Sequence, residues 1–198
     1  PHQVRQEEQP LVGGSDVPKA ESTQADRPGE PTFVFVGYDD QAIYIAFNCA
    51  ESQSDQRDVA RTNYVRYEGM TPVGEDLVEV LLDPAAVAAT SGDLYHLVVK
   101  ANGAVIAERG IGTRTPIGAH SPWTADVEVG VDAKSTPGRW FVEIRLGWSS
   151  FGKDIRRDAV WGVNFARLQN RTGEYSTWSG ARWNVYSPGT LGNLCFLP

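Results

Sequence analysis

The sequence predicts an all-β protein, an antiparallel β-sandwich with jelly-roll or immunoglobulin-like layering. Short segments rich in β-branched and aromatic residues recur along the chain with turn signals between them, a pattern typical of sandwiches. Twelve Pro and twenty Gly among 198 residues supply those turns. The sequence shows no amphipathic helix of useful length, so we expect about nine or ten strands and little helix.

Two parts of the chain differ in composition. Residues 1–32 are polar and rich in Pro, Glu, Gln and Gly, which predicts an extended lead-in where Leu11-Val12 could form an edge strand. Residues 33–198 are long enough for a single domain with its own core. The sequence starts at Pro1, without Met and without a signal peptide, so we expect a segment of a longer protein.

The overall composition argues against several classes of partner. Hydrophobic residues make up 41% and charged residues 22%, as in water-soluble globular proteins. A net charge of −7 without a cluster of Lys and Arg argues against nucleic acid. No apolar run approaches the ~20 residues of a membrane span. The two cysteines, Cys49 and Cys195, could form one disulfide or remain two small hydrophobic residues.

The expected strands are separated by clear turns and two long loops. Asp39 and Asp40 are the turn formers of a first hairpin, and Asn102-Gly103 is the strongest short hairpin signal. Residues 50–75 and 169–190 predict long polar loops, and loops of this length are often functional. The predicted strands span residues 32–36, 42–47, 77–83, 94–100, 104–108, 123–131, 140–146, 161–168 and 192–197.

A carboxylate interrupts the apolar strand 77–83. Because side chains alternate along a strand, the Val and Leu residues at even positions share one face and Glu79 lies on the other. A carboxylate buried in mid-strand is costly unless a partner pairs with it or solvent reaches it. Glu79 therefore marks either a structural ion pair or the floor of a polar binding surface.

Polar strand residues and loop aromatic residues together are consistent with a sugar-binding surface. Charged side chains form charge-assisted hydrogen bonds with hydroxyl groups, and aromatic rings stack on the C–H faces of sugars. The alternative is that the charged residues form solvated sheet faces or cross-strand salt bridges. The polar candidates are Glu79, Lys100, Glu143, Arg145, Asn164 and Arg167, and the aromatic candidates are Tyr64, Tyr67, Trp178 and Trp183. The core is expected to hold Trp123, Trp140, Trp148 and Trp161.

Carboxylates in loops offer the oxygen ligands that Ca²⁺ prefers, and the candidates for a structural calcium site are Asp39, Asp40 and Asp76. The alternative is that these residues only keep the surface polar. Glycoside hydrolysis needs two carboxylates at a defined separation, which strand spacing does not fix for Glu79, Asp83 and Glu143. The sequence contains no nucleophile elbow, zinc set or phosphate loop, so we expect no enzymatic activity in this segment.

The order of these motifs resembles carbohydrate-binding module family 9. Six stretches carry the resemblance over roughly residues 33–197, namely residues 38–47, 75–83, 95–103, 140–146, 161–167 and 191–196. The resemblance implies a β-sandwich that serves as an accessory module of secreted, glycoside hydrolase-type enzymes that degrade polysaccharides. It also implies an extracellular, periplasmic or cell-surface location and structural Ca²⁺.

Characterised members of that family hold the reducing end of a glucan or xylan chain between two tryptophans. Glu79 matches the glutamate in the family's central strand, and Asn164 matches an asparagine in the Trp-Gly-Val-Asn strand. Trp183 matches the tryptophan that precedes the last strand. The resemblance thus implies that these three residues contact sugar.

Other positions depart from the family pattern. Val73 stands where the first stacking tryptophan is expected, and Val98 stands where a binding arginine is expected. Lys100 falls on the position of a nearby asparagine, and Tyr67 or Tyr64 could replace the missing tryptophan.

The expected function is a non-catalytic carbohydrate-binding module for an oligo- or polysaccharide. Its predicted contacts are Trp183, Glu79, Asn164, Arg167, Trp178, Tyr67 and Lys100. One alternative is a structural or interaction β-sandwich domain that has lost the sugar site. Another is a haem-binding relative, for which Met70 with His120 or His96 is the available pair.

Overall fold

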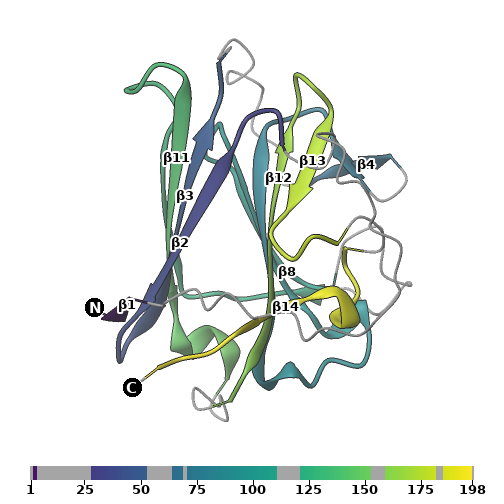
Figure 1. Ribbon diagram of the computed structural model, residues 1–198. Coiled ribbons are helices and arrows are strands. Elements are labelled where there is room, and N and C mark those ends of the chain that lie inside the picture. Colours follow the sequence, from purple (N-terminus) through teal and green to yellow (C-terminus); the bar gives the residue numbers. More distant parts are fainter. Residues whose placement is uncertain are drawn as a thin grey trace, which may run out of the picture.

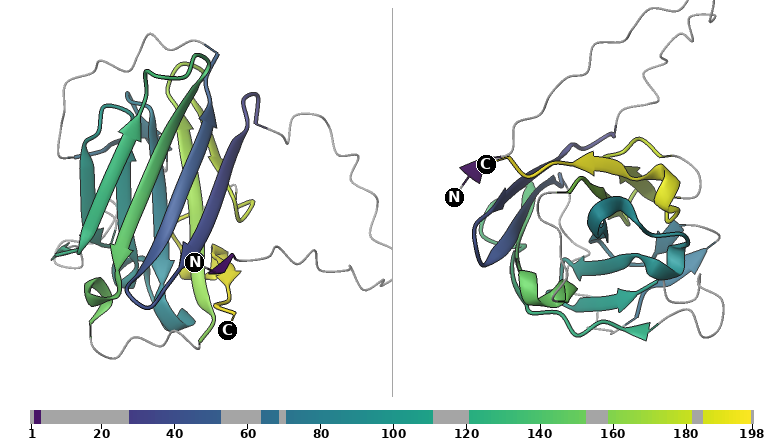
Figure 2. Two further views of the ribbon diagram at one scale, coloured as in Figure 1. Left: turned by 90° about the vertical axis from the view of Figure 1, so that its left-hand side faces the viewer. Right: turned by 90° about the horizontal axis from the view of Figure 1, so that it is seen from below.

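The computed structural model is an antiparallel β-sandwich, which confirms the predicted fold class (Figure 1). It describes residues 2–3, 28–52, 64–68, 71–110, 121–152, 159–181 and 185–197. The first sheet has the strand order β1-β2-β3-β11-β10, and the second has the order β13-β12-β6-β7-β8-β9, with β14 also paired to β12. The left view of Figure 2 looks onto the first sheet, whose long strands lie side by side in front of the second.

The first sheet consists of β1 (His2–Gln3), β2 (Thr32–Tyr38), β3 (Ala42–Ala50), β10 (Val127–Asp132) and β11 (Arg139–Gly147). The second consists of β6 (Leu77–Asp83), β7 (Tyr95–Lys100), β8 (Val105–Arg109), β9 (Ser121–Pro122), β12 (Trp161–Gln169), β13 (Glu174–Thr177) and β14 (Gly192–Leu194). A separate hairpin is formed by β4 (Arg66–Glu68) and β5 (Thr71–Val73). The helical turns are short 3₁₀ segments, η2 (Pro84–Ala86), η3 (Ser91–Asp93), η5 (Trp148–Phe151) and η6 (Pro188–Thr190).

Both predicted hairpins are present, and their turn residues explain them. The Asp39 carboxylate accepts the backbone N–H groups of Gln41 (2.7 Å) and Ala42 (2.9 Å), which closes the turn between β2 and β3. Asn102 accepts the N–H of Ala104 at 3.0 Å in the turn between β7 and β8. Gly103 has a φ of +83°, a conformation that costs glycine little.

The main hydrophobic core fills the space between the two sheets. The even-numbered side chains of β6 face this core, as the alternation predicts. Trp140 and Trp161 are fully buried in it, and Trp123 and Trp148 are 8% exposed, which confirms that all four are core residues. Full burial of one large apolar side chain contributes roughly 1.5–3 kcal/mol.

A third layer covers the outer face of the second sheet, and we call it the roof. It contains residues 65–67, Tyr175 of β13 and residues 185–191, which pack on the odd-numbered residues Leu77 and Leu81 of β6. Figure 1 shows β4 on the side of this sheet that faces away from the first sheet. Because both faces of β6 are covered, all seven of its residues are buried.

Several predicted boundaries were wrong. The expected loops 50–75 and 169–190 contain the short strands β4, β5 and β13. These strands have too few apolar residues to show the alternation that predicts a strand. The strand expected at 123–131 begins at Val127, because residues 123–126 pass from β9 in the second sheet to β10 in the first. The closing strand ends at Leu194. The edge strand expected at residues 11–12 lies outside the described residues.

The two cysteines are both free thiols. Cys49 is buried in the main core and Cys195 is exposed. Burial raises the pKa of the Cys49 thiol to about 12, so it stays protonated as a small hydrophobic residue.

Candidate functional site

The candidate site is a buried polar cluster beneath the roof, on the outer face of the second sheet. Its centre is Glu79, which is fully buried. We call it the Glu79 cluster and define it as Glu79, His96, Glu108, Tyr67, Tyr175 and Tyr186. β6, β7 and β8 supply the two carboxylates and the imidazole, and the roof supplies the three phenols.

Three tyrosine hydroxyls donate hydrogen bonds to the Glu79 carboxylate. Tyr186 donates to Oε2 at 3.1 Å, Tyr67 donates to Oε1 at 3.4 Å, and Tyr175 also donates to Oε2. Burial and the charge of Glu79 raise the pKa of all three phenols, so they remain donors throughout the ordinary pH range. The roof is therefore fastened to the sheet through the carboxylate.

His96 lies between two carboxylates. Its Nδ1 is 2.9 Å from Glu108 Oε1, and its Nε2 is 3.4 Å from Glu79 Oε1. Burial lowers the pKa of His96, but the hydrogen bonds and charges of Glu108 and Glu79 outweigh burial and raise it to about 9. His96 is therefore an imidazolium at neutral pH. It partly compensates the two acids and helps explain why Glu79 can be buried.

The other polar residues predicted on this face lie at its margins. Lys100 is buried at the end of β7, where it pairs with Glu75 and donates to the carbonyl of Tyr64 at 2.8 Å. Asn164 of β12 shares the face with Glu79. It stands opposite Leu81, which is two residues from Glu79 on β6 and therefore points to the same side. Its Oδ1 accepts the N–H of Ser179 at 3.1 Å. Its Nδ2 is buried and has no hydrogen-bond partner among the described residues.

Arg167 is not brought to this site. It points between the two sheets from β12, where it pairs with the buried carboxylate of Glu51 at 3.1 Å and donates to the Ala50 carbonyl at 2.6 Å. Arg171 joins the same network through Glu51 at 3.3 Å and Glu30 at 3.0 Å. Arg167 therefore links β12 of the second sheet to the end of β3 in the first sheet.

The predicted aromatic contacts are also divided. Tyr67 belongs to the Glu79 cluster, whereas Trp178 packs edge to face on Phe165 of the main core and lies over Gly192. Trp183 lies outside the described residues. Its described neighbours on either side are Ala181 and Val185, and both belong to the apolar cluster around Leu81 and Tyr186.

The two positions that depart from the family pattern are both apolar, and one of them adjoins the candidate site. Val98 stands directly opposite Glu79 on β7 and is fully buried. Val73 lies in β5, paired with Arg66. The space beside Glu79 is therefore apolar at Val98 and closed by tyrosines above.

The three calcium candidates do not lie together. Asp39 and Asp40 lie in the turn before β3. Asp76 precedes β6 and accepts the N–H of Asn170 at 2.8 Å, next to the Arg171–Glu51 contact at the other end of β3. A strand the length of β3 spans about 30 Å. In the part of the chain that the structure describes, no three His, Cys, Asp or Glu residues form a group that could hold a metal ion.

Sequence reasoning missed four members of the Glu79 cluster: His96, Glu108, Tyr175 and Tyr186. The first two had a signal, because the three-residue turn Ala101–Gly103 is centred on Asn102, and residues equidistant from Asn102 pair, which sets His96 opposite Glu108. Tyr175 and Tyr186 had none, since the segments that carry them show no strand pattern.

Fold and site together define a β-sandwich module with a roofed polar sheet face. Among the described residues, no helix is long and apolar enough to cross a membrane. Neither protein-family models nor curated proteins match the sequence.

Solved structures share the fold. A carbohydrate-binding module of family 9 from Caldicellulosiruptor kristjanssonii in complex with cellotriose aligns over 91% of this chain and 88% of that chain, with a TM-score of 0.54 and 17% identity. The complex of that module with glucose aligns over 91% of this chain and 90% of that chain, with a TM-score of 0.55 and 17% identity. A protein from Bacteroides uniformis, to which carbohydrate binding is provisionally attributed, aligns over 88% of this chain and 82% of that chain. The TM-score is 0.62 and the identity is 12%. At these identities the likeness establishes a family 9-like fold and no more.

Proposed function

We propose that this domain is a non-catalytic carbohydrate-binding module. The observation that carries the proposal is that Glu79 and Asn164 lie on one sheet face, where the Asn164 Nδ2 donor is buried and lacks a partner among the described residues. A buried unsatisfied donor is costly, and a ligand hydroxyl would satisfy it. The same two residues are among the three that match the family pattern, and structures with this fold include complexes with cellotriose and glucose.

In this proposal the roof is part of the site. The segment with Trp183 supplies the stacking ring, and Asn164 supplies the hydrogen bond. Glu79 acts mainly by fixing the tyrosines, because its oxygens already accept hydrogen bonds from three tyrosine hydroxyls and Oε1 lies 3.4 Å from the His96 imidazolium. The wider role we propose is that of an accessory domain of a secreted polysaccharide-degrading enzyme, with Ca²⁺ as a structural ion.

A titration calorimetry panel of mono- and oligosaccharides tests the proposal. We expect binding to at least one glycan, and we expect Trp183→Ala to abolish the binding event that this site contributes. Val87→Ala is the control, since that side chain is 76% exposed, has no part in the proposed site and is expected to leave affinity unchanged. Full affinity in Trp183→Ala would contradict the site.

A structural or interaction domain without a sugar site is the second candidate. The observation that favours it is the complete burial of Glu79, whose carboxylate is bound by groups of the chain itself. Absence of binding to every glycan of the panel at millimolar concentration would decide for this candidate.

A further inference from the structure

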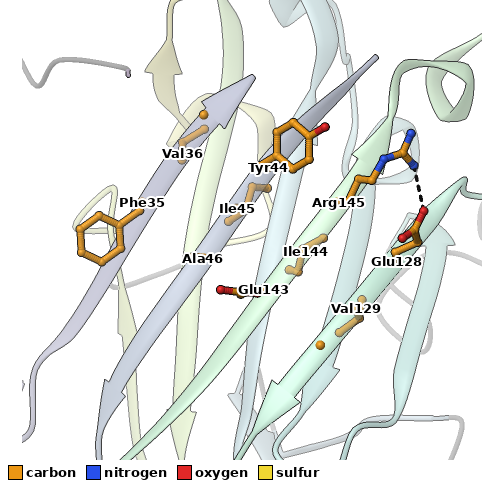
Figure 3. Close-up of a pocket in the computed structure, with 12 residues that line it drawn as sticks. Phe35, Val36, Tyr44, Ile45, Ala46, Glu128, Val129, Glu143, Ile144 and Arg145 are labelled. Atoms are coloured by element: carbon orange, nitrogen blue, oxygen red, sulfur yellow. Dashed lines mark hydrogen bonds and ion pairs between the residues drawn. The ribbon is translucent and has the colours of Figure 1, made fainter. Parts of the chain in front are cut away.

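A groove crosses the outer face of the first sheet, on the opposite side of the sandwich from the Glu79 cluster. Its volume is about 640 Å³, within the range of ligand sites. It is lined by residues of β2, β3, β11 and β10, and Figure 3 shows their side chains. Two of the sequence-predicted polar residues, Glu143 and Arg145, lie here rather than near Glu79.

Small residues form the floor of the groove. One row across the strands reads Phe35, Ala46, Glu143 and Gly130, so an alanine lies between a ring and a carboxylate and a glycine lies at the far side. A Cβ added at Gly130 would meet nothing within 4 Å, so the space above this residue is open. Four strands at ~4.8 Å spacing span about 14 Å, room for several linked sugar rings.

Exposed rings flank the floor. Phe35 is 61% exposed and Tyr44 is 36% exposed, and they are diagonal neighbours on β2 and β3 (Figure 3). Phe33, one step along β2 on the same face, is 51% exposed. Single exposed apolar residues are ordinary, but adjoining exposed rings on one sheet face mark a binding surface. Such rings stack on the C–H face of a sugar.

The polar groups of the groove suit hydroxyl donors. Glu143 is exposed and forms no hydrogen bond or ion pair with any described residue, so both of its oxygens can accept. Arg145 is held in place by Glu128 and Asp126, each at 3.4 Å, and lies beside Tyr44. Acidic groups outnumber the arginine, which disfavours an anionic polymer.

We propose that this groove binds a neutral, hydroxyl-rich glycan chain laid across β2, β3, β11 and β10. The rings of Phe35 and Tyr44 stack on sugar faces, and the Glu143 carboxylate accepts sugar hydroxyls. This inference shares only its ligand class with the proposed function, and it uses a different face of the sandwich.

The test is titration calorimetry of the whole chain with cellohexaose, xylohexaose and mannohexaose, and with an oligogalacturonide as the anionic probe. We expect a neutral hexaose to bind and the anionic probe to bind at least tenfold more weakly. Phe35→Ala combined with Tyr44→Ala removes both stacking rings and is expected to weaken binding about tenfold, which corresponds to about 1.4 kcal/mol shared between two ring contacts.

Gly130→Val is a second variant that fills the groove from its floor. It is expected to weaken binding about tenfold while the urea midpoint stays the same or rises, because valine suits a strand better than glycine. Val87→Ala, at a 76% exposed residue outside both faces, is the control.

The outcomes separate this inference from the proposed function. Binding that survives the groove variants and is lost in Trp183→Ala overturns the groove and supports the proposed site. The reverse pattern supports the groove and overturns the site. Absence of binding to every probe overturns both, and self-association abolished by Phe35→Ala with Tyr44→Ala would show that the occupant is a second copy of the chain.

Discussion

His96 makes the stability of this domain depend on pH between about 6 and 9. Its folded-state pKa of about 9 lies above the ordinary 6.5, because Glu108 and Glu79 outweigh the effect of burial. The folded chain therefore holds the proton more tightly than the unfolded chain does. The difference corresponds to roughly 3 kcal/mol of folding free energy. This contribution is complete below about pH 6.5 and is lost as the pH rises through 9.

The perturbation that isolates this effect is His96→Gln, which is uncharged at every pH. Urea unfolding, followed by tryptophan fluorescence, gives the free energy of unfolding of both proteins from pH 6 to pH 9.5. We expect the stability advantage of the wild type over the variant to shrink by about 3 kcal/mol across this range. Cys49 also lowers stability at high pH, since its thiol ionises only on unfolding, but this effect is common to both proteins and cancels.

A difference between wild type and variant that stays flat, or grows with pH, would refute the reasoning. NMR titration of the imidazole provides an independent reading in the intact wild type. In Glu108→Gln the pKa of His96 should fall, because one of its two carboxylate partners becomes neutral. An unchanged pKa would show that the 2.9 Å contact between Nδ1 and Glu108 does not set the charge of the imidazole.

Other predictions concern stability and metal. Arg167→Ala should lower the free energy of unfolding by roughly 3–5 kcal/mol in urea titrations, because Glu51 would be left buried and only partly paired. A loss under about 1 kcal/mol would contradict the stabilising link between the two sheets. Leu82→Ala should cost about 2–5 kcal/mol and Val87→Ala less than about 0.5, and equal losses would contradict the assigned core. Tyr175→Phe should cost about 1–3 kcal/mol by removing a donor to a buried carboxylate, which a melting point equal to that of wild type would exclude. Adding a chelator should lower the melting temperature if Ca²⁺ is structural, and an unchanged value counts against the ion.

The fold was predictable because it follows from local signals. Alternation in β6 and the turn residues at Asp39 and Asn102 set strand faces and hairpins before any tertiary contact is known. The family pattern implies that Glu79 and Asn164 contact sugar, and the register of β6 with β12 sets both residues on one face of the sheet.

The remainder of the site depended on information that local patterns do not carry. Arg167 was placed with Asn164, although residues three apart on one strand face opposite ways, so parity alone excluded the pair. Glu143 and Arg145 do share a face, but no pattern tells to which sheet their strand belongs. The roof consists of segments without strand or helix periodicity, so the enclosure of Glu79 by tyrosines follows only from tertiary packing.

The groove and the Glu79 cluster look outward in opposite directions, with two sheets about 10 Å apart between them. One ligand therefore cannot touch both faces without passing round the edge of the sandwich. With a glycan bound on each face as proposed, the domain would be bivalent within a single copy. It would act as a cross-linker between neighbouring polymer strands, and its retention on an insoluble matrix would exceed what either face achieves alone.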